Sequence, residues 1–139
     1  MSDAPTAEDE ELVVLPLQGW SVTQCCVDYG FTINLWRVEG EFSIRIETSF
    51  SLVASKEELA IHIGFGSIRE LAPALEIFSS SVDRAVVYRS GKLSLNFSNG
   101  IFIQIAPDEQ YEAWIVTGPH GFRIVSLPGG GIASWGAAV

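Results

Sequence analysis

The strongest constraint on the fold is a hairpin signal in residues 92–105. Apolar residues occupy alternate positions on both sides of Asn99-Gly100. Asn-Gly favours a tight hairpin turn, because both turn residues then need positive φ. Alternation of apolar and polar residues is typical of a strand with one buried face. The segment therefore predicts two antiparallel strands whose core-facing residues are Leu93, Leu95, Phe97, Ile101, Ile103 and Ile105.

The same alternation marks strands along most of the chain. Residues 20–37 predict two strands around a turn at 28–30, and residues 41–50 add a third strand after Glu39-Gly40. Their core-facing residues are Phe31, Ile33, Leu35, Phe42, Ile44 and Ile46. Further strands are expected at 82–89, 111–117, 122–127 and 132–135. We therefore expect about eight to nine short antiparallel strands in meanders, and the pattern leaves open a partial barrel.

One segment changes from the period of a strand to that of a helix. Apolar residues spaced 3, 4 and 3 apart would lie on one side of a helix; they are Ile68, Leu71, Leu75 and Phe78. Ser67 and Glu70 fit a capping box ahead of them. Pro73 either kinks this helix or lies in the first turn of a helix that begins near Ala72. We expect one helix near 67–80 packed on the strands, which makes the fold class α+β.

Charge and composition limit the classes of function. The chain is 47% hydrophobic and has a net charge of −9, from 17 acidic and 8 basic residues. Five of the acidic residues lie in residues 1–11, which we expect to be a disordered acidic leader before a single domain over 12–139. No basic stripe suggests nucleic acid, and no apolar run suggests a membrane span or a secretory signal. The expected location is the cytoplasm.

Few residues carry recognisable chemistry. Cys25 and Cys26 are adjacent on an expected strand, so they point to opposite faces and form no ordinary disulfide. We expect one to be a small core residue and the other to be half exposed. The run Gly64 to Ser67 resembles a loose anion nest but lacks the lysine of a phosphate-binding loop. No zinc or nucleophile motif is found, so no metal or cofactor is expected.

Candidate site residues gather in residues 111–135. Strand alternation places Glu112 beside Trp114, which would suit acid–base chemistry or a cation site. The favoured alternative is an ion pair with Arg123 across the hairpin. His120 lies in a turn and is expected to be accessible. The eight candidate binding residues are Tyr111, Glu112, Trp114, His120, Arg123, Gly129, Gly130 and Trp135.

Glycines and tryptophans in and around this region have two interpretations. Consecutive glycines follow Pro128, and they favour either a tight turn with positive φ or a close approach of backbone to a ligand or neighbouring chain. Tryptophan is enriched both in cores and at interfaces. Of the four, Trp20, Trp36, Trp114 and Trp135, we expect two in the core and at least one partly exposed.

Three motifs resemble a family of small bacterial, mainly actinobacterial, domains of unknown function. The first motif holds Gly91, Leu93, Phe97 and Gly100; the second is Tyr111 to Trp114; the third holds Pro128, Gly129, Gly130 and Trp135. The resemblance covers roughly Leu17 to Trp135 and leaves out the acidic leader. It implies a bacterial, cytoplasmic, single-domain protein, and it implies no activity.

The leading functional hypothesis is a non-enzymatic protein-interaction module that binds through residues 111–135. One version is an immunity-type inhibitor of a basic toxin, by analogy of protein type alone. The alternative is a small-molecule-binding domain with a pocket between sheet and helix, lined by Trp114, Trp135 and Glu112. An enzyme using Glu112 or His120 as general base is a third hypothesis. A homodimer is compatible with all three.

Overall fold

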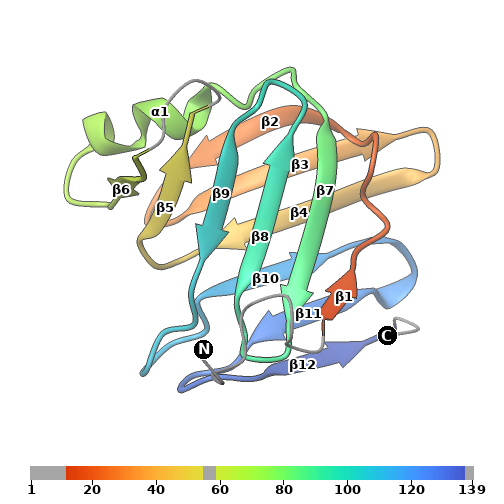
Figure 1. Ribbon diagram of the computed structural model, residues 1–139. Coiled ribbons are helices and arrows are strands. Elements are labelled where there is room, and N and C mark those ends of the chain that lie inside the picture. Colours follow the sequence, from red (N-terminus) through yellow and green to blue (C-terminus); the bar gives the residue numbers. More distant parts are fainter. Residues whose placement is uncertain (1–11, 55–58, 137–139) are drawn as a thin grey trace, which may run out of the picture.

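The protein forms two six-stranded antiparallel sheets that pack face to face. The structure is a computed structural model that describes residues 12–54 and 59–136. Sheet A has the strand order β1-β7-β8-β9-β5-β6, and sheet B has the order β12-β11-β10-β4-β3-β2. Figure 1 shows the strands of one sheet crossing those of the other, and neither sheet closes into a barrel.

Sheet A contains strands from both halves of the chain. Its strands are β1 (Leu12–Val14), β5 (Phe50–Val53), β6 (Ile61–Ile63), β7 (Val82–Tyr88), β8 (Leu93–Phe97) and β9 (Phe102–Ile105). The expected hairpin at Asn99-Gly100 joins β8 to β9. Its turn has three residues, because Phe97 N–H donates to the Ile101 carbonyl over 2.9 Å. Only Gly100 of the pair has positive φ, at 89°, so the hairpin is confirmed and the two-residue turn is wrong.

Sheet B consists of two three-stranded meanders. The first contains β2 (Ser21–Val27), β3 (Phe31–Arg37) and β4 (Gly40–Ile46). The second contains β10 (Trp114–Thr117), β11 (Arg123–Ser126) and β12 (Ile132–Trp135), with the short 3₁₀ turn η3 (Pro119–Gly121) between β10 and β11. Strands β4 and β10 pair and join the meanders into one sheet. Both meanders match the strand segments expected from the sequence.

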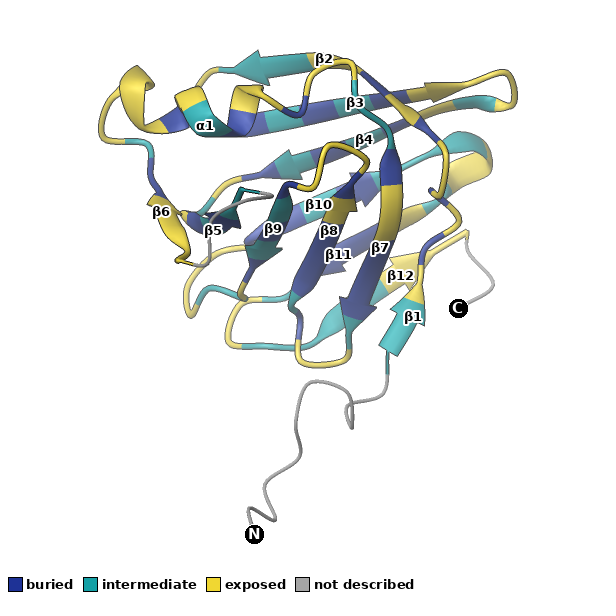
Figure 2. Ribbon diagram, turned by 45° about the horizontal axis from the view of Figure 1, so that its top comes forward, coloured by how far each residue is buried: buried dark blue, intermediate teal, exposed yellow. Residues whose placement is uncertain are grey.

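One hydrophobic core fills the space between the two sheets. All twelve core-facing residues predicted from alternation are buried; they are Phe31, Ile33, Leu35, Phe42, Ile44, Ile46, Leu93, Leu95, Phe97, Ile101, Ile103 and Ile105. Figure 2 shows buried residues concentrated in the central strands of both sheets. At about 25 cal/mol per Å² of buried apolar area, this core is the main stabilising term.

The expected count of eight to nine strands is wrong for the described residues, which form twelve. The three missed strands are β1, β5 and β6, and they have only three, four and three residues. A period of two is not recognisable over so few positions. Among the described residues, no helix has the length and apolar character needed to span a bilayer.

The expected helix near 67–80 is much shorter than predicted. A 3₁₀ turn, η2 (Ile68–Leu71), leads into α1 (Ala72–Leu75), which has Pro73 in its first turn. The expected apolar stripe is wrong, because Ile68, Leu75 and Phe78 are exposed. The buried residues are instead Leu71, Ala74 and Ile77, three apart as the 3₁₀ repeat requires.

The capping box ahead of this helix is absent, and a carboxylate of the protein itself lies against the loop of the expected anion nest. Ser67 makes no side-chain capping hydrogen bond. The carboxylate of Glu70 lies against the loop instead, 2.8 Å from the position of a Cβ on Gly64 and on Gly66. The glycines of this loop therefore accommodate a side chain of the protein itself.

Candidate functional site

The structure divides the eight candidate residues between two ends of sheet B. Tyr111 and Glu112 precede β10 in the loop that contains Asp108, and the Asp108 carbonyl of this loop accepts the Gly129 N–H over 2.7 Å. His120 and the Arg123–Trp135 pair lie at the opposite end of β10 and β11. Trp114 is fully buried between these groups. The eight residues therefore form no single surface.

The segments of all three family-like motifs meet in contacts that join the two sheets. The Trp114 Nε1–H donates to the Gly91 carbonyl over 2.9 Å, and the Ser126 hydroxyl donates to the same carbonyl over 3.0 Å. The Gly131 N–H donates to the Ser90 carbonyl over 2.8 Å. We call these five residues the inter-sheet clamp. They fasten the β7–β8 hairpin of sheet A onto β10, β11 and the β11–β12 turn of sheet B.

The glycines after Pro128 have a structural reason within the chain itself. Gly129, Gly130 and Gly131 have φ of 80°, 118° and 93°, values that side-chain-bearing residues rarely adopt. A Cβ on Gly91 would lie 2.9 Å from the Gly131 carbonyl oxygen. The tight-turn alternative is therefore confirmed, and the close backbone approach joins two turns of the same chain.

Tyr111 and Glu112 lie in an exposed loop outside the strand. The Asp108 carboxylate holds this loop by accepting the Gln110 and Tyr111 N–H groups over 2.8 and 3.0 Å. Strand β10 begins only at Trp114, and Ala113 beside it is fully buried as well. The predicted alternation from 111 to 117 is therefore wrong at its start, and Glu112 does not lie beside the indole on a strand face.

The expected ion pair between Glu112 and Arg123 does not form. Arg123 lies opposite Thr117 on β10 and opposite Trp135 on β12. Its guanidinium carbon is 5.8 Å from the centroid of the Trp135 ring, a cation–π contact. Trp135 and Trp36 are half exposed and Trp20 and Trp114 are buried, which confirms the expectation for the four tryptophans.

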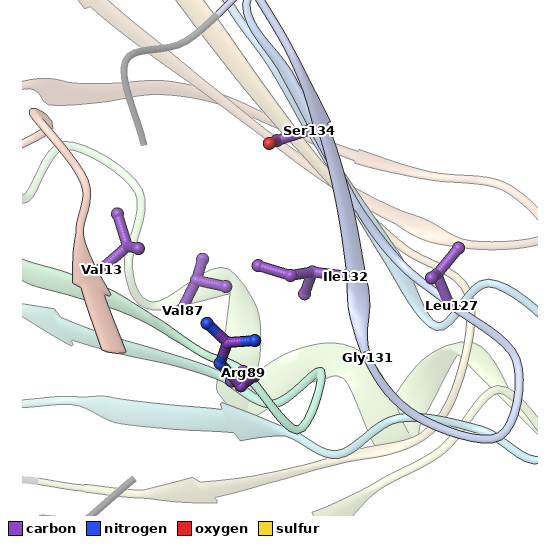
Figure 3. Close-up of a pocket in the computed structure, with 7 residues that line it drawn as sticks. All are labelled: Val13, Val87, Arg89, Leu127, Gly131, Ile132 and Ser134. Carbon is purple, nitrogen blue, oxygen red and sulfur yellow. The ribbon is translucent and has the colours of Figure 1, made fainter. Parts of the chain in front are cut away.

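Two cavities lie on the open side of the molecule, where the edge strands β1 and β12 face each other. The smaller has a volume of about 340 Å³ and lies between Val13 and Val87 of sheet A and Ile132 and Ser134 of sheet B. Figure 3 shows Val13 and Val87 pointing toward Ile132 across this space. The larger, of about 520 Å³, also contacts Val13 and continues toward η3. We call the two cavities together the edge groove.

Aromatic rings form the inner wall of the larger cavity. Trp20 and Phe122 each pack edge-on against Phe42, with centroid distances of 4.9 and 5.1 Å. Glu39 and His120 supply its polar groups. His120 has a φ of 61°, a left-handed conformation that is uncommon for a residue with a side chain. His120 is the one candidate residue that the structure places in the edge groove.

The outer edge of β12 has no pairing strand among the described residues. The Leu127 N–H donates to the Gly131 carbonyl over 2.9 Å, so this pair starts the ladder, and bonded and non-bonded pairs then alternate. Ala133 and Trp135 fall at bonded positions opposite β11, and Ile132 and Ser134 fall between them. The N–H and C=O groups of Ile132 and Ser134 therefore point away from β11, and no described strand pairs with β12 there.

Neither cysteine lies in the edge groove. Both are partly buried; Cys25 packs against the hydrophobic core, as expected for one of the two, although it is not fully buried. Burial, with a smaller contribution from Cys26, raises the pKa of the Cys25 thiol to about 11. A thiol that stays protonated is a poor nucleophile. The described residues contain no group of three or more histidine, cysteine or acidic side chains able to hold a metal ion.

Sequence reasoning found His120 but missed the rest of the edge groove. Its walls come from β1, the approach to β2, strands β4, β7 and β12, and the β3–β4 and β10–β11 connections. No local motif marks such a site, because its residues are brought together only by sheet packing.

Comparison with known proteins identifies one family. The model of a family of unknown function, DUF6188, matches residues 13–136. No curated protein matches the chain, and no solved structure does. The matched range includes every described residue of both sheets except Leu12.

Proposed function

The chain belongs to the family of unknown function DUF6188, and from its geometry we propose that it is a non-enzymatic protein-interaction module. Its site is the edge groove, and its occupant is an extended segment of a partner protein. The observation that carries the proposal is the free edge of β12 beside two cavities. An added strand needs both features, because backbone hydrogen bonds supply affinity and pockets for alternate side chains supply specificity.

The partner segment would lie along β12 as a seventh strand of sheet B. Its backbone would bond to Ile132 and Ser134, whose N–H and C=O groups point outward. Alternate side chains of a strand point to the same face, so every second residue of the segment would face into the groove. Val13, Val87, Leu127 and Ile132 give the smaller cavity its apolar walls, and Arg89 and Ser134 supply its polar side chains (Figure 3). The proposal therefore specifies a segment with apolar residues at alternate positions.

Charge favours a basic partner at long range. The chain has a net charge of −9, which attracts positively charged proteins during encounter. Near the larger cavity, Glu39 already forms an exposed ion pair with Arg37, with Oε1 3.4 Å from Nε. Such pairs contribute little, so contact would rest on apolar burial and backbone bonds. An immunity-type inhibitor of a basic toxin in the bacterial cytoplasm is one version of this proposal.

Ser134 offers a matched test of the added strand. Ser134→Pro removes an outward N–H and leaves the bonded pairs with β11 in place, whereas Ser134→Ala keeps the N–H. Tagged wild type and both variants would be purified gently from the native host and measured by native mass spectrometry. We expect one reproducible partner on wild type and Ser134→Ala and its loss from Ser134→Pro, with circular dichroism confirming that each variant is folded.

Three results would count against this assignment. A partner retained equally by folded Ser134→Pro would exclude the β12 edge. A bare chain in all three samples would exclude a tight protein complex. A homodimer that Ser134→Pro dissociates would make a second copy of this chain the occupant of the edge.

A second candidate function is binding of a small apolar molecule in the larger cavity. Its volume of about 520 Å³ lies within the usual range of ligand pockets, and its aromatic wall supports this alternative. The cavity differs in place from the expected pocket between sheet and helix, since none of its lining residues belongs to η2 or α1.

The fluorescence of Trp20 provides a direct test of small-molecule binding in the larger cavity. A ligand in the larger cavity should change the tryptophan fluorescence of wild type, and Trp20→Phe should remove most of the change. A flat response across a broad panel of metabolites would argue against a small-molecule ligand there.

A further inference from the structure

A second polar pocket lies on the outer face of sheet A, away from the edge groove. Ser51 on β5 lies directly opposite His62 on β6 and opposite Gln104 on β9. Directly opposed residues on neighbouring strands place their side chains on the same face within contact range. The flanking residues Phe50, Leu52, Ile63, Ile103 and Ile105 are buried in the core, so the three polar side chains point outward.

A cavity of about 390 Å³ forms over this row, with Lys92 and Ser49 also in its lining. Lys92 is held by a cation–π contact, with Nζ 4.5 Å from the centroid of the Tyr88 ring. The Gln104 amide is oriented by donating to the Ser94 hydroxyl over 3.2 Å. The lining thus contains an ammonium, an imidazole, an amide and two hydroxyls, all of which can donate hydrogen bonds.

The charge of this cavity differs from that of the whole molecule. None of its described lining residues is acidic, although the chain has 17 acidic residues against 8 basic ones. The carboxylate of Glu70 lies with the His62 imidazole against Gly64 and does not line the cavity. A fixed cation surrounded by neutral donors favours an anion with several acceptor oxygens.

We propose that this pocket binds the phosphate group of a small molecule. Lys92 supplies the charge, and His62, Gln104 and the Ser51 hydroxyl donate to the phosphate oxygens. Phosphate suits the donor set better than a carboxylate, because it presents more acceptor oxygens to donors that come from three strands and the β4–β5 and β7–β8 connections. This site is independent of the edge groove, so either assignment stands if the other fails.

Inorganic phosphate is the probe for this site. It would be titrated into ¹⁵N-labelled full-length protein at constant ionic strength, with sodium chloride as the reference salt. We expect saturable shifts of the Ser51, His62, Lys92 and Gln104 amides. Acetate in a parallel titration should bind more weakly, and acetate binding as tight as phosphate binding would overturn the phosphate assignment.

Charge-removing variants locate the binding. Lys92→Gln should weaken phosphate binding at least about tenfold, as expected when the charged partner of an anion is removed. Arg123→Gln removes the same charge from sheet B and should leave the affinity unchanged. Gln104→Leu removes the amide donor and keeps the charge of Lys92, and it should also weaken phosphate binding. The proposal is overturned if the four amides show no saturable shift, or if Lys92→Gln and Arg123→Gln bind phosphate equally.

Discussion

Replacing Trp114 by phenylalanine should lower the free energy of unfolding by about 2–3 kcal/mol. The indole N–H donates to the Gly91 carbonyl over 2.9 Å, and the side chain is fully buried. A buried hydrogen bond contributes about 1 kcal/mol net. Loss of the second ring leaves unfilled core space, which costs about 1–2 kcal/mol more. The replacement should change the stability of the fold, because the Trp114 side chain of the clamp is buried away from solvent.

Ser126 makes the prediction sharper, because both donors share one acceptor. Ser126→Ala alone should cost about 1 kcal/mol, since Trp114 still donates to the Gly91 carbonyl. The double variant leaves that carbonyl without either donor. Its loss of stability should therefore exceed the sum of the single losses by about 1 kcal/mol.

Urea unfolding followed by circular dichroism measures these differences without relying on tryptophan fluorescence. Trp36→Phe is the matched control, because Trp36 is 50% exposed and its replacement should change stability by less than about 0.5 kcal/mol. A loss below about 0.5 kcal/mol for Trp114→Phe, together with strict additivity in the double variant, would refute the clamp.

Three further predictions concern charge, reactivity and packing. Hydrogen bonding to Arg45 and to the Gly30 N–H lowers the pKa of Asp28 below 3.8, so the stability it adds is present at neutral pH and is lost as pH falls through that lowered value. The gap in melting temperature between wild type and Arg45→Gln should therefore shrink at low pH, and a constant gap would contradict this. Because the pKa of Cys25 is raised to about 11, iodoacetamide should label this thiol far more slowly at pH 8 in native protein than in urea-unfolded protein. Fragment-ion mass spectrometry would measure the extent of labelling at Cys25. Equal rates would show that the thiol is not protected. Gly118→Ala places a Cβ against the Phe42 ring and should lower the unfolding free energy by about 1–3 kcal/mol in urea titrations; an unchanged value would mean that the ring moves freely.

Local patterns in the sequence predicted much of the sheet structure. The meanders of sheet B and the β7–β8–β9 meander follow from alternation, since the buried face of a strand recurs every second residue. Of the two alternatives that Pro73 left open, the structure has the second, with α1 beginning at Ala72, because proline is favoured in the first turn of a helix. These features depend on neighbouring residues, and so a single sequence contains them.

Features that depend on contacts between distant segments were not predictable in this way. The strand alternation assigned to Glu112 fails because the chain enters β10 from a loop that buries both Ala113 and Trp114. The glycines after Pro128 have the positive φ of the expected tight turn, whereas the close approach, expected to a ligand or a neighbouring chain, is to the hairpin at Ser90-Gly91 of the same chain. Most lining residues of the edge groove carry no motif of their own.

Amide hydrogen exchange along β12 tests the proposed binding mode most directly. In the free protein, the Ala133 and Trp135 amides should be protected by β11, whereas the Ile132 and Ser134 amides should exchange quickly because they point outward. In the complex with the partner isolated from the host, the Ile132 and Ser134 amides should become protected as well. Fast exchange of these two amides in a stable complex would contradict strand addition at this edge.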